Sequence, residues 1–170
     1  MDARPFDRID LAAVLPDLTE GETTRIRRAA ARLEVPEPGS GRSGWTWFPN
    51  RTKDPGGHGW VIFGIAFLYR TPTDDDVEFD LQVSRKEPPR LAIDVSIGVC
   101  CSCEENHNTH EVRSQSWLVG TAAAFTDSFE SATIALASWI AGSHEPSTYR
   151  AAAGLPNPPD QKKVSPREST

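Results

Sequence analysis

Residues 77–99 read VEFDLQVSRKEPPRLAIDVSIGV, with two runs of alternating apolar and polar side chains on either side of a charged turn that contains two prolines. A period of two places successive side chains on opposite faces of a strand. Each run therefore predicts a half-buried antiparallel strand, and together they predict a hairpin. Pairing Val83 with Leu91 keeps the apolar side chains on one face and would place Asp80 directly opposite Asp94.

The neighbouring segments extend this sheet in both directions. Residues 59–69 form an apolar run rich in branched and aromatic side chains, and pairing Tyr69 with Val77 predicts a further hairpin. Residues 110–121 indicate another strand, but their alternation changes parity, which predicts a β-bulge. The sheet thus has four strands, or five if a short strand forms at 45–48.

Helical patterns stand before and after the strands. Thr19 and Glu22 have the spacing of a capping box, and Pro36 ends the helix that follows. A second helix is expected from Thr126 or Asp127 to about residue 141. The predicted fold class is α+β: an antiparallel four- to five-stranded meander sheet with N-terminal helices and one C-terminal helix packed on it.

The 170 residues suffice for one domain with a substantial core. We expect an N-terminal helical segment at 1–36 and a loop with the short strand at 37–58. Residues 59–142 supply the sheet and the C-terminal helix of the same single domain. Residues 143–170 are rich in proline and polar side chains and are expected to be a disordered tail.

Composition restricts the function classes. The chain has 18 basic and 24 acidic side chains, a net charge of -6, which disfavours nucleic acid and anionic membranes as partners. Three cysteines are an odd number without a disulfide spacing, so reduced thiols in the cytoplasm are expected. Residues 1–10 do not have the pattern of a secretory leader. Arginine outnumbers lysine and alanine is abundant, which is typical of a high-GC bacterial genome.

Soft metal ligands gather in residues 100–110, CCSCEENHNTH. Cys100, Cys103, His107 and His110 are candidate zinc ligands, because thiolates and imidazoles are the usual choice of zinc. Their spacing lacks the roughly dozen residues that separate the ligand pairs of finger-type sites. The simpler interpretation is a polar hairpin loop without a cofactor, and zinc is the alternative.

Acidic residues gather between Thr71 and Gln82, within the hairpin predicted at 59–84. This stretch contains no basic residue. The acidic side chains are Asp74, Asp75, Asp76, Glu78 and Asp80, and Asp94 joins them through the predicted register. Like charges that face each other are destabilising, so Arg85, a cation or a basic partner should offset them. A solvated surface that maintains solubility is the simpler interpretation, and a basic protein partner is the functional one.

Residues 59–69 are also apolar on their second face, which begins with Trp60. Monomers rarely expose large apolar patches, so we expect the N-terminal segment to cover this face, unless a partner or a second copy of the chain does. Arg25, Arg28 and Arg32 share one side of the first long helix and would be the contact points for nucleic acid.

Enzymatic signatures are missing: the chain has no GxSxG, HExxH, P-loop or GxGxxG motif. The sequence therefore favours a non-catalytic cytoplasmic protein-binding module, of the immunity or adaptor type. Its surface would be the acidic hairpin and the apolar face near Trp60. Two alternatives remain open: a small zinc-stabilised module with nucleic-acid contact, and a thiol-dependent enzyme.

Overall fold

The computed structural model describes residues 5–34, 42–49, 60–70, 76–87, 89–100, 109–142 and 151. Its elements, in chain order, are η1 (Pro5–Arg8), α1 (Leu11–Val14), α2 (Glu20–Ala31), β1 (Arg42–Pro49), β2 (Trp60–Arg70), β3 (Asp76–Arg85), β4 (Leu91–Cys100), β5 (Thr109–Val119) and α3 (Ala122–Ala141). Strand β1 has eight residues and contains the short strand expected at 45–48. The tail expected at 143–170 lies outside the described residues, apart from residue 151.

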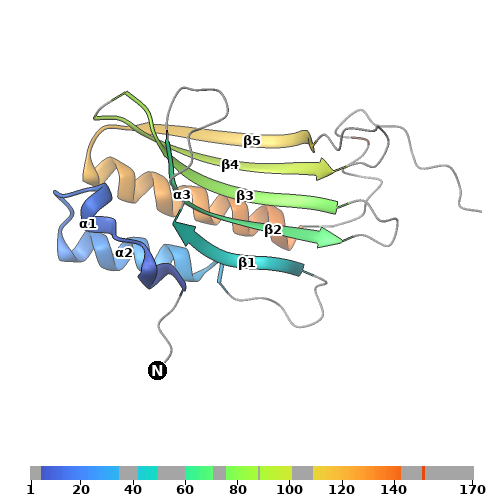
Figure 1. Ribbon diagram of the computed structural model, residues 1–170, viewed down its shortest axis with the longest axis horizontal. Coiled ribbons are helices and arrows are strands. Elements are labelled where there is room, and N and C mark those ends of the chain that lie inside the picture. Colours follow the sequence, from blue (N-terminus) through green and yellow to red (C-terminus); the bar gives the residue numbers. More distant parts are fainter. Residues whose placement is uncertain are drawn as a thin grey trace, which may run out of the picture.

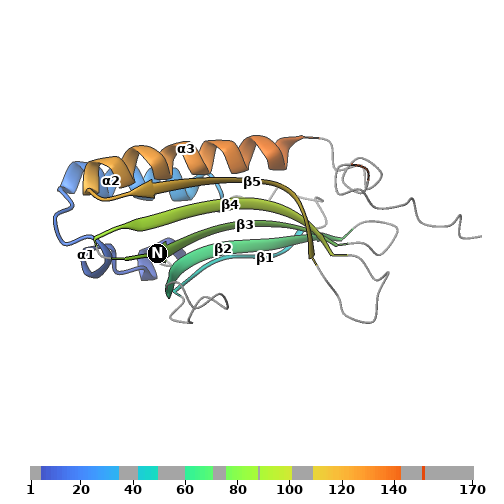
Figure 2. The same cartoon turned by 90° about the horizontal axis from the view of Figure 1, so that it is seen from above.

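The five strands form one antiparallel sheet in the order β1-β2-β3-β4-β5, in which each strand pairs with its neighbour in the chain (Figure 1). Helices α2 and α3 lie side by side on one face of this sheet (Figure 2). The predicted α+β fold with a meander sheet and terminal helices is confirmed. Within the described ranges, no helix combines the length and the apolar character that crossing a membrane requires.

The N-terminus of α2 is the predicted one, but that of α3 is not. Thr19 and Glu22 form the expected capping box of α2. Helix α3 begins at Ala122, after the cap Thr121, so the expected start at Thr126 or Asp127 is wrong. The Thr126 hydroxyl donates to the Ala122 carbonyl oxygen (2.9 Å), which satisfies it inside the helix without ending the helix.

The predicted register is confirmed in one hairpin and wrong in the other. Tyr69 lies opposite Val77, as expected, but Val83 lies opposite Ile93 instead of Leu91. The observed register extends β3 to Arg85, opposite Leu91, and the Lys86 N–H donates to the Arg90 carbonyl oxygen at 3.0 Å, which closes the turn. The observed hairpin leaves Pro89 in the turn.

The observed register of this hairpin differs from the expected one by two residues. Because successive side chains alternate between the two faces of a strand, a shift of two residues leaves every side chain on its predicted face. The partners nevertheless change. Asp80 lies opposite Ser96 and Asp94 lies opposite Gln82, so the expected direct pair of Asp80 and Asp94 is wrong. The two carboxylates are diagonal neighbours.

Register shifts interrupt three of the strand pairs, and the one between β1 and β2 lies between Ser43 and Thr46. The predicted bulge of β5 is present, with Val112 as the extra residue. A second bulge, between Val61 and Phe63 of β2, was not expected. It places Val61 opposite Ser84 and outside the main core, whereas Ile62 packs against that core.

Four aromatic rings unite the N-terminal segment, the sheet and α3. Phe6 of η1 lies 4.8 Å from the ring of Trp47 and 5.9 Å from that of Phe63, and Phe129 of α3 lies 5.9 Å from Trp47. All four residues are almost fully buried. The described part of the N-terminal segment therefore packs on the same face as α3. The expectation that it covers the second face of β2 is wrong, because Phe6 places it against the aromatic core.

We predict that Phe6→Ala lowers the free energy of unfolding by about 3–5 kcal/mol, because it leaves a cavity among three buried rings. Urea denaturation followed by circular dichroism measures this loss. Arg8→Ala, at an exposed position of the same segment, is the control and should change stability by no more than about 0.5 kcal/mol. A small effect of Phe6→Ala would contradict the packing of η1 on the core.

Candidate functional site

The sheet face opposite α2 and α3, named here the open face, has no described helix on it (Figure 2). Strand pairing and alternation assign its side chains. They are Val61 and Ala66 of β2; Glu78, Asp80, Gln82 and Ser84 of β3; Ala92, Asp94 and Ser96 of β4; and Glu111, Ser114, Ser116 and Leu118 of β5.

Carboxylates dominate the charge of the open face. Glu78, Asp80, Asp94 and Glu111 all belong to it, and none of the side chains assigned to it above is basic. In the part of the chain that the structure describes, no lysine or arginine forms an ion pair with Glu78, Asp80 or Asp94. Arg85, considered above as an offsetting charge, makes none with them. The described part of this face is therefore acidic without internal compensation.

Asp80 is half-buried near the middle of the open face. Its Oδ2 accepts a hydrogen bond from Gln82 Nε2 at 2.8 Å. Burial raises the pKa of Asp80 to about 6, and the negative charges of Glu78 and Asp94 add to this rise. The Gln82 hydrogen bond lowers the pKa, but by less than burial raises it. Asp80 is thus a poorly solvated carboxylate that has only a neutral donor among the described residues.

Two other carboxylates of the open face are also held by neutral donors. The Ser116 hydroxyl donates to Asp94 Oδ1, and the Ser114 hydroxyl donates to Glu111 Oε1 at 2.9 Å. Hydroxyl donors orient a carboxylate without neutralising its charge. The arrangement keeps the acidic groups in place and leaves their charge available to a cation from outside.

A row of three apolar side chains and one serine borders the acidic region. Val61, Ser84, Ala92 and Leu118 are neighbours across β2, β3, β4 and β5. Leu118 is 59% exposed, whereas the other three are buried, so this row is accessible only at its β5 end. Ser84 Oγ has no hydrogen-bond partner within the described ranges. The open face thus combines carboxylates with an exposed leucine at its β5 edge.

The structure places the sequence-predicted acidic site only in part. Glu78, Asp80 and Asp94 share the open face. Asp76 is the first residue of β3 and Trp60 the first of β2, but their side chains lie outside the described residues, as do Asp74 and Asp75 entirely.

Sequence reasoning missed Glu111 and Leu118. Their shared face depends on the extra residue Val112, because the bulge reverses the alternation between them. The change of parity in 110–121 signalled a bulge, but alternation alone did not show which residue was the extra one.

The Cys/His cluster remains a prediction. Cys103 and His107 lie outside the described residues, and so does the side chain of Cys100. His110 lies opposite Val99, while Thr109 is the residue opposite Cys100. Among the residues that the structure describes, no three His, Cys, Asp or Glu side chains are grouped so as to hold a metal ion.

Arg25 and Arg28 of α2, with Arg32 at its C-cap, do not form a free basic stripe. Arg25 Nη2 lies 2.8 Å from Asp127 Oδ1 and 2.7 Å from Glu130 Oε2, both on α3. The hydrogen bond from Arg25 holds the pKa of Glu130 below its usual value. Arg25 therefore connects α2 to α3, which leaves Arg28 and Arg32 as weaker grounds for nucleic-acid contact.

Comparison of the chain with protein-family models, with curated proteins and with solved structures finds no match.

Asp80 makes stability depend on pH. Its pKa is about 6 in the folded protein against an ordinary value of 3.8, so between these values only the folded state holds the proton. Stability should therefore fall as the pH rises through this window. We predict that Asp80→Asn raises the free energy of unfolding by about 1–3 kcal/mol at about pH 7.5 and leaves it unchanged near pH 4.

Urea denaturation at both pH values measures this effect, and the carbon-13 shift of the Asp80 carboxyl should titrate with a midpoint near the stated pKa. Glu87→Gln removes the same charge at an exposed position of the β3–β4 turn and is the control. Equal effects of the two substitutions would contradict the burial argument.

We expect no stoichiometric zinc in protein purified under reducing conditions, because the ligand spacing is unlike that of known finger sites. Plasma mass spectrometry, with melting curves before and after EDTA, tests this. Near-stoichiometric zinc that is lost in Cys103→Ser would instead make Cys100, Cys103, His107 and His110 a folding site.

Proposed function

We propose that the protein is a non-catalytic binding module whose open face docks a basic protein partner. The observation that carries this proposal is Asp80: a half-buried carboxylate with a raised pKa, between Glu78 and Asp94, and without a cation among the described residues. Keeping such a group charged at neutral pH costs stability, and a cation supplied by a partner would reverse that cost.

The electrostatics also favour recognition. Carboxylates at separate positions on β3, β4 and β5 make a surface of one sign, and such a surface attracts a partner of opposite charge and orients it during encounter. The net charge of -6 also favours attraction of a positively charged partner. Lysine or arginine side chains of the partner could each reach a carboxylate across the pleated sheet.

Leu118 gives the surface an apolar contact beside the charges. A leucine that is 59% exposed at the edge of an acidic region suits an interface in which an apolar anchor is surrounded by polar contacts. The proposed partner therefore has a basic patch next to an apolar side chain. The proposed compartment is the cytoplasm, on the ground of the three cysteines without a disulfide spacing.

The zinc-stabilised module and the thiol-dependent enzyme remain alternatives that depend on residues 100–110. No observation on the described residues favours either of them over docking on the open face. The zinc measurement given above tests the first, and iodoacetamide labelling of the cysteines as a function of pH tests the second.

Site-specific photo-crosslinking tests the proposal with a matched pair of positions. Leu118 is 59% exposed on the open face, and Ile134 is 55% exposed on α3. A benzophenone amino acid at position 118 should give adducts with a basic protein in cells, and the same group at position 134 should not. Equal adducts at both positions would contradict docking on the open face.

Charge substitution then tests the electrostatic part. Glu78→Gln combined with Asp94→Asn should abolish most of the adduct at position 118, because two of the attracting charges are removed. Glu87→Gln, outside the open face, should leave it unchanged. Adducts that are insensitive to these substitutions and to added salt would refute a basic partner.

A further inference from the structure

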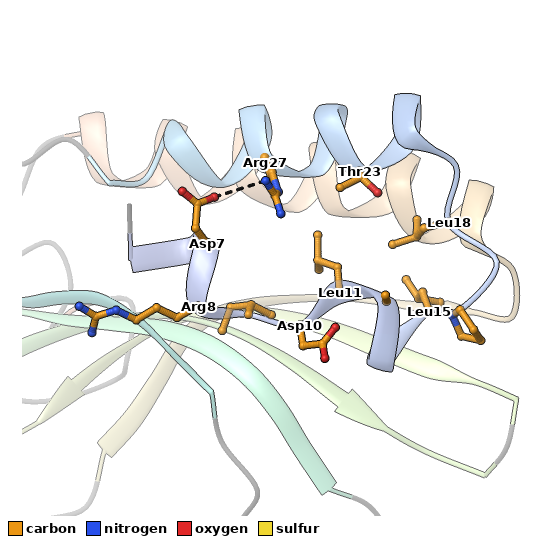
Figure 3. Close-up of a pocket in the computed structure, with 11 residues that line it drawn as sticks. Asp7, Arg8, Asp10, Leu11, Leu15, Leu18, Thr23 and Arg27 are labelled. Atoms are coloured by element: carbon orange, nitrogen blue, oxygen red, sulfur yellow. Dashed lines mark ion pairs between the residues drawn. The ribbon is translucent and has the colours of Figure 1, made fainter. Parts of the chain in front are cut away.

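A pocket on the helix-covered side of the sheet is independent of the open face. It lies where η1 and α1 are inserted between α2 and the strands (Figure 3). Its volume is about 390 Å³, within the range of small-molecule sites. Residues from η1, α1, α2 and the turn between α1 and α2 form its walls.

One end of the pocket is apolar. Leu11, Leu15 and Leu18 line it, and Figure 3 shows Leu11 extending from α1 toward α2. Leu15 and Leu18 are only half-buried, although both pack against the edge of the core. A bound apolar chain would complete the burial of these two side chains, which is favourable because it removes apolar area from water.

The other end presents the guanidinium group of Arg27. Arg27 Nη1 lies 3.6 Å from Asp7 Oδ1, a distance too long for a hydrogen bond (Figure 3). Arg25, two residues away, contrasts with it, because contacts of 2.7 and 2.8 Å engage its Nη2. Among the described residues, Arg27 therefore keeps donors that a ligand can use.

The remaining polar groups indicate the charge of the ligand. Asp10 is engaged as the N-cap of α1, where it accepts a hydrogen bond from Ala13 N at 3.1 Å. The Thr23 hydroxyl donates to the Thr19 carbonyl oxygen at 3.0 Å. Arg8 also lines the pocket, but Figure 3 shows its side chain directed away from Arg27. Asp7 and Asp10 line the pocket as well, and they would repel a dianion such as phosphate. A single negative charge is the best match to Arg27 in this setting.

We propose that this pocket binds a small monocarboxylate with an unbranched apolar tail. The carboxylate would accept paired hydrogen bonds from Arg27, the geometry that a guanidinium group favours. The tail would lie along Leu11, Leu15 and Leu18. Asp7 competes with the ligand for Arg27 and so limits its affinity.

The test titrates octanoate into the full chain, below the concentration at which octanoate self-associates, and follows amide and arginine side-chain shifts by NMR. Saturable shifts should map to α1 and to the part of α2 from Thr23 to Arg27. Octanol, which lacks the charge, and acetate, which lacks the tail, should each bind at least about tenfold more weakly. Absence of saturation with octanoate, or equal binding of octanol, would overturn the proposal.

Substitutions at exposed positions separate binding from folding. Arg27→Gln should weaken octanoate binding by about tenfold or more, and Asp7→Asn should strengthen it several-fold, because it frees Arg27. Arg28→Gln, a neighbouring exposed arginine that does not line the pocket, should leave the affinity unchanged. Unchanged affinity in Arg27→Gln, or equal losses in Arg27→Gln and Arg28→Gln, would refute the role of Arg27.

Discussion

The contact of Phe129 with Phe6, Trp47 and Phe63 is the constraint on which the arrangement of the molecule depends. It brings one ring each from α3, η1, β1 and β2 into a single buried cluster. Such packing removes large apolar areas from water and fixes the relative positions of elements that are far apart in the chain. The N-terminal segment, the sheet and the last helix therefore form one unit.

One-sided burial has a direct consequence for the second face of the sheet. The apolar residues of β3 and β4 point toward α3, so their alternate positions must point away from it. Those positions carry Glu78, Asp80 and Asp94, and hydroxyl or amide donors hold the last two in place. The same alternation that builds the core thus builds an acidic surface, and partial burial of Asp80 makes it the most strained member electrostatically.

Arg25 and Arg27 of α2 each contact an acidic residue, but tertiary contacts give them different roles. Arg25 points to α3 and is engaged by Asp127 and Glu130, so it supports the packing of the two helices. Arg27 faces η1, where its contact with Asp7 is long. Residues two positions apart on a helix point in different directions, which is why the first serves the fold and the second borders a pocket.

Local pattern by itself determined the strands, the capping box of α2 and the face of each residue of β3 and β4, because side-chain alternation and capping act between near neighbours. It also identified Glu78, Asp80 and Asp94 as members of one surface. The turn at Pro89 and the bulge at Val61 depend on backbone hydrogen bonding between strands, which a period of two does not encode. Only the tertiary structure decided the burial of Asp80, the pairing of Arg25 and the pocket beside Arg27, because each depends on how separate elements pack against one another.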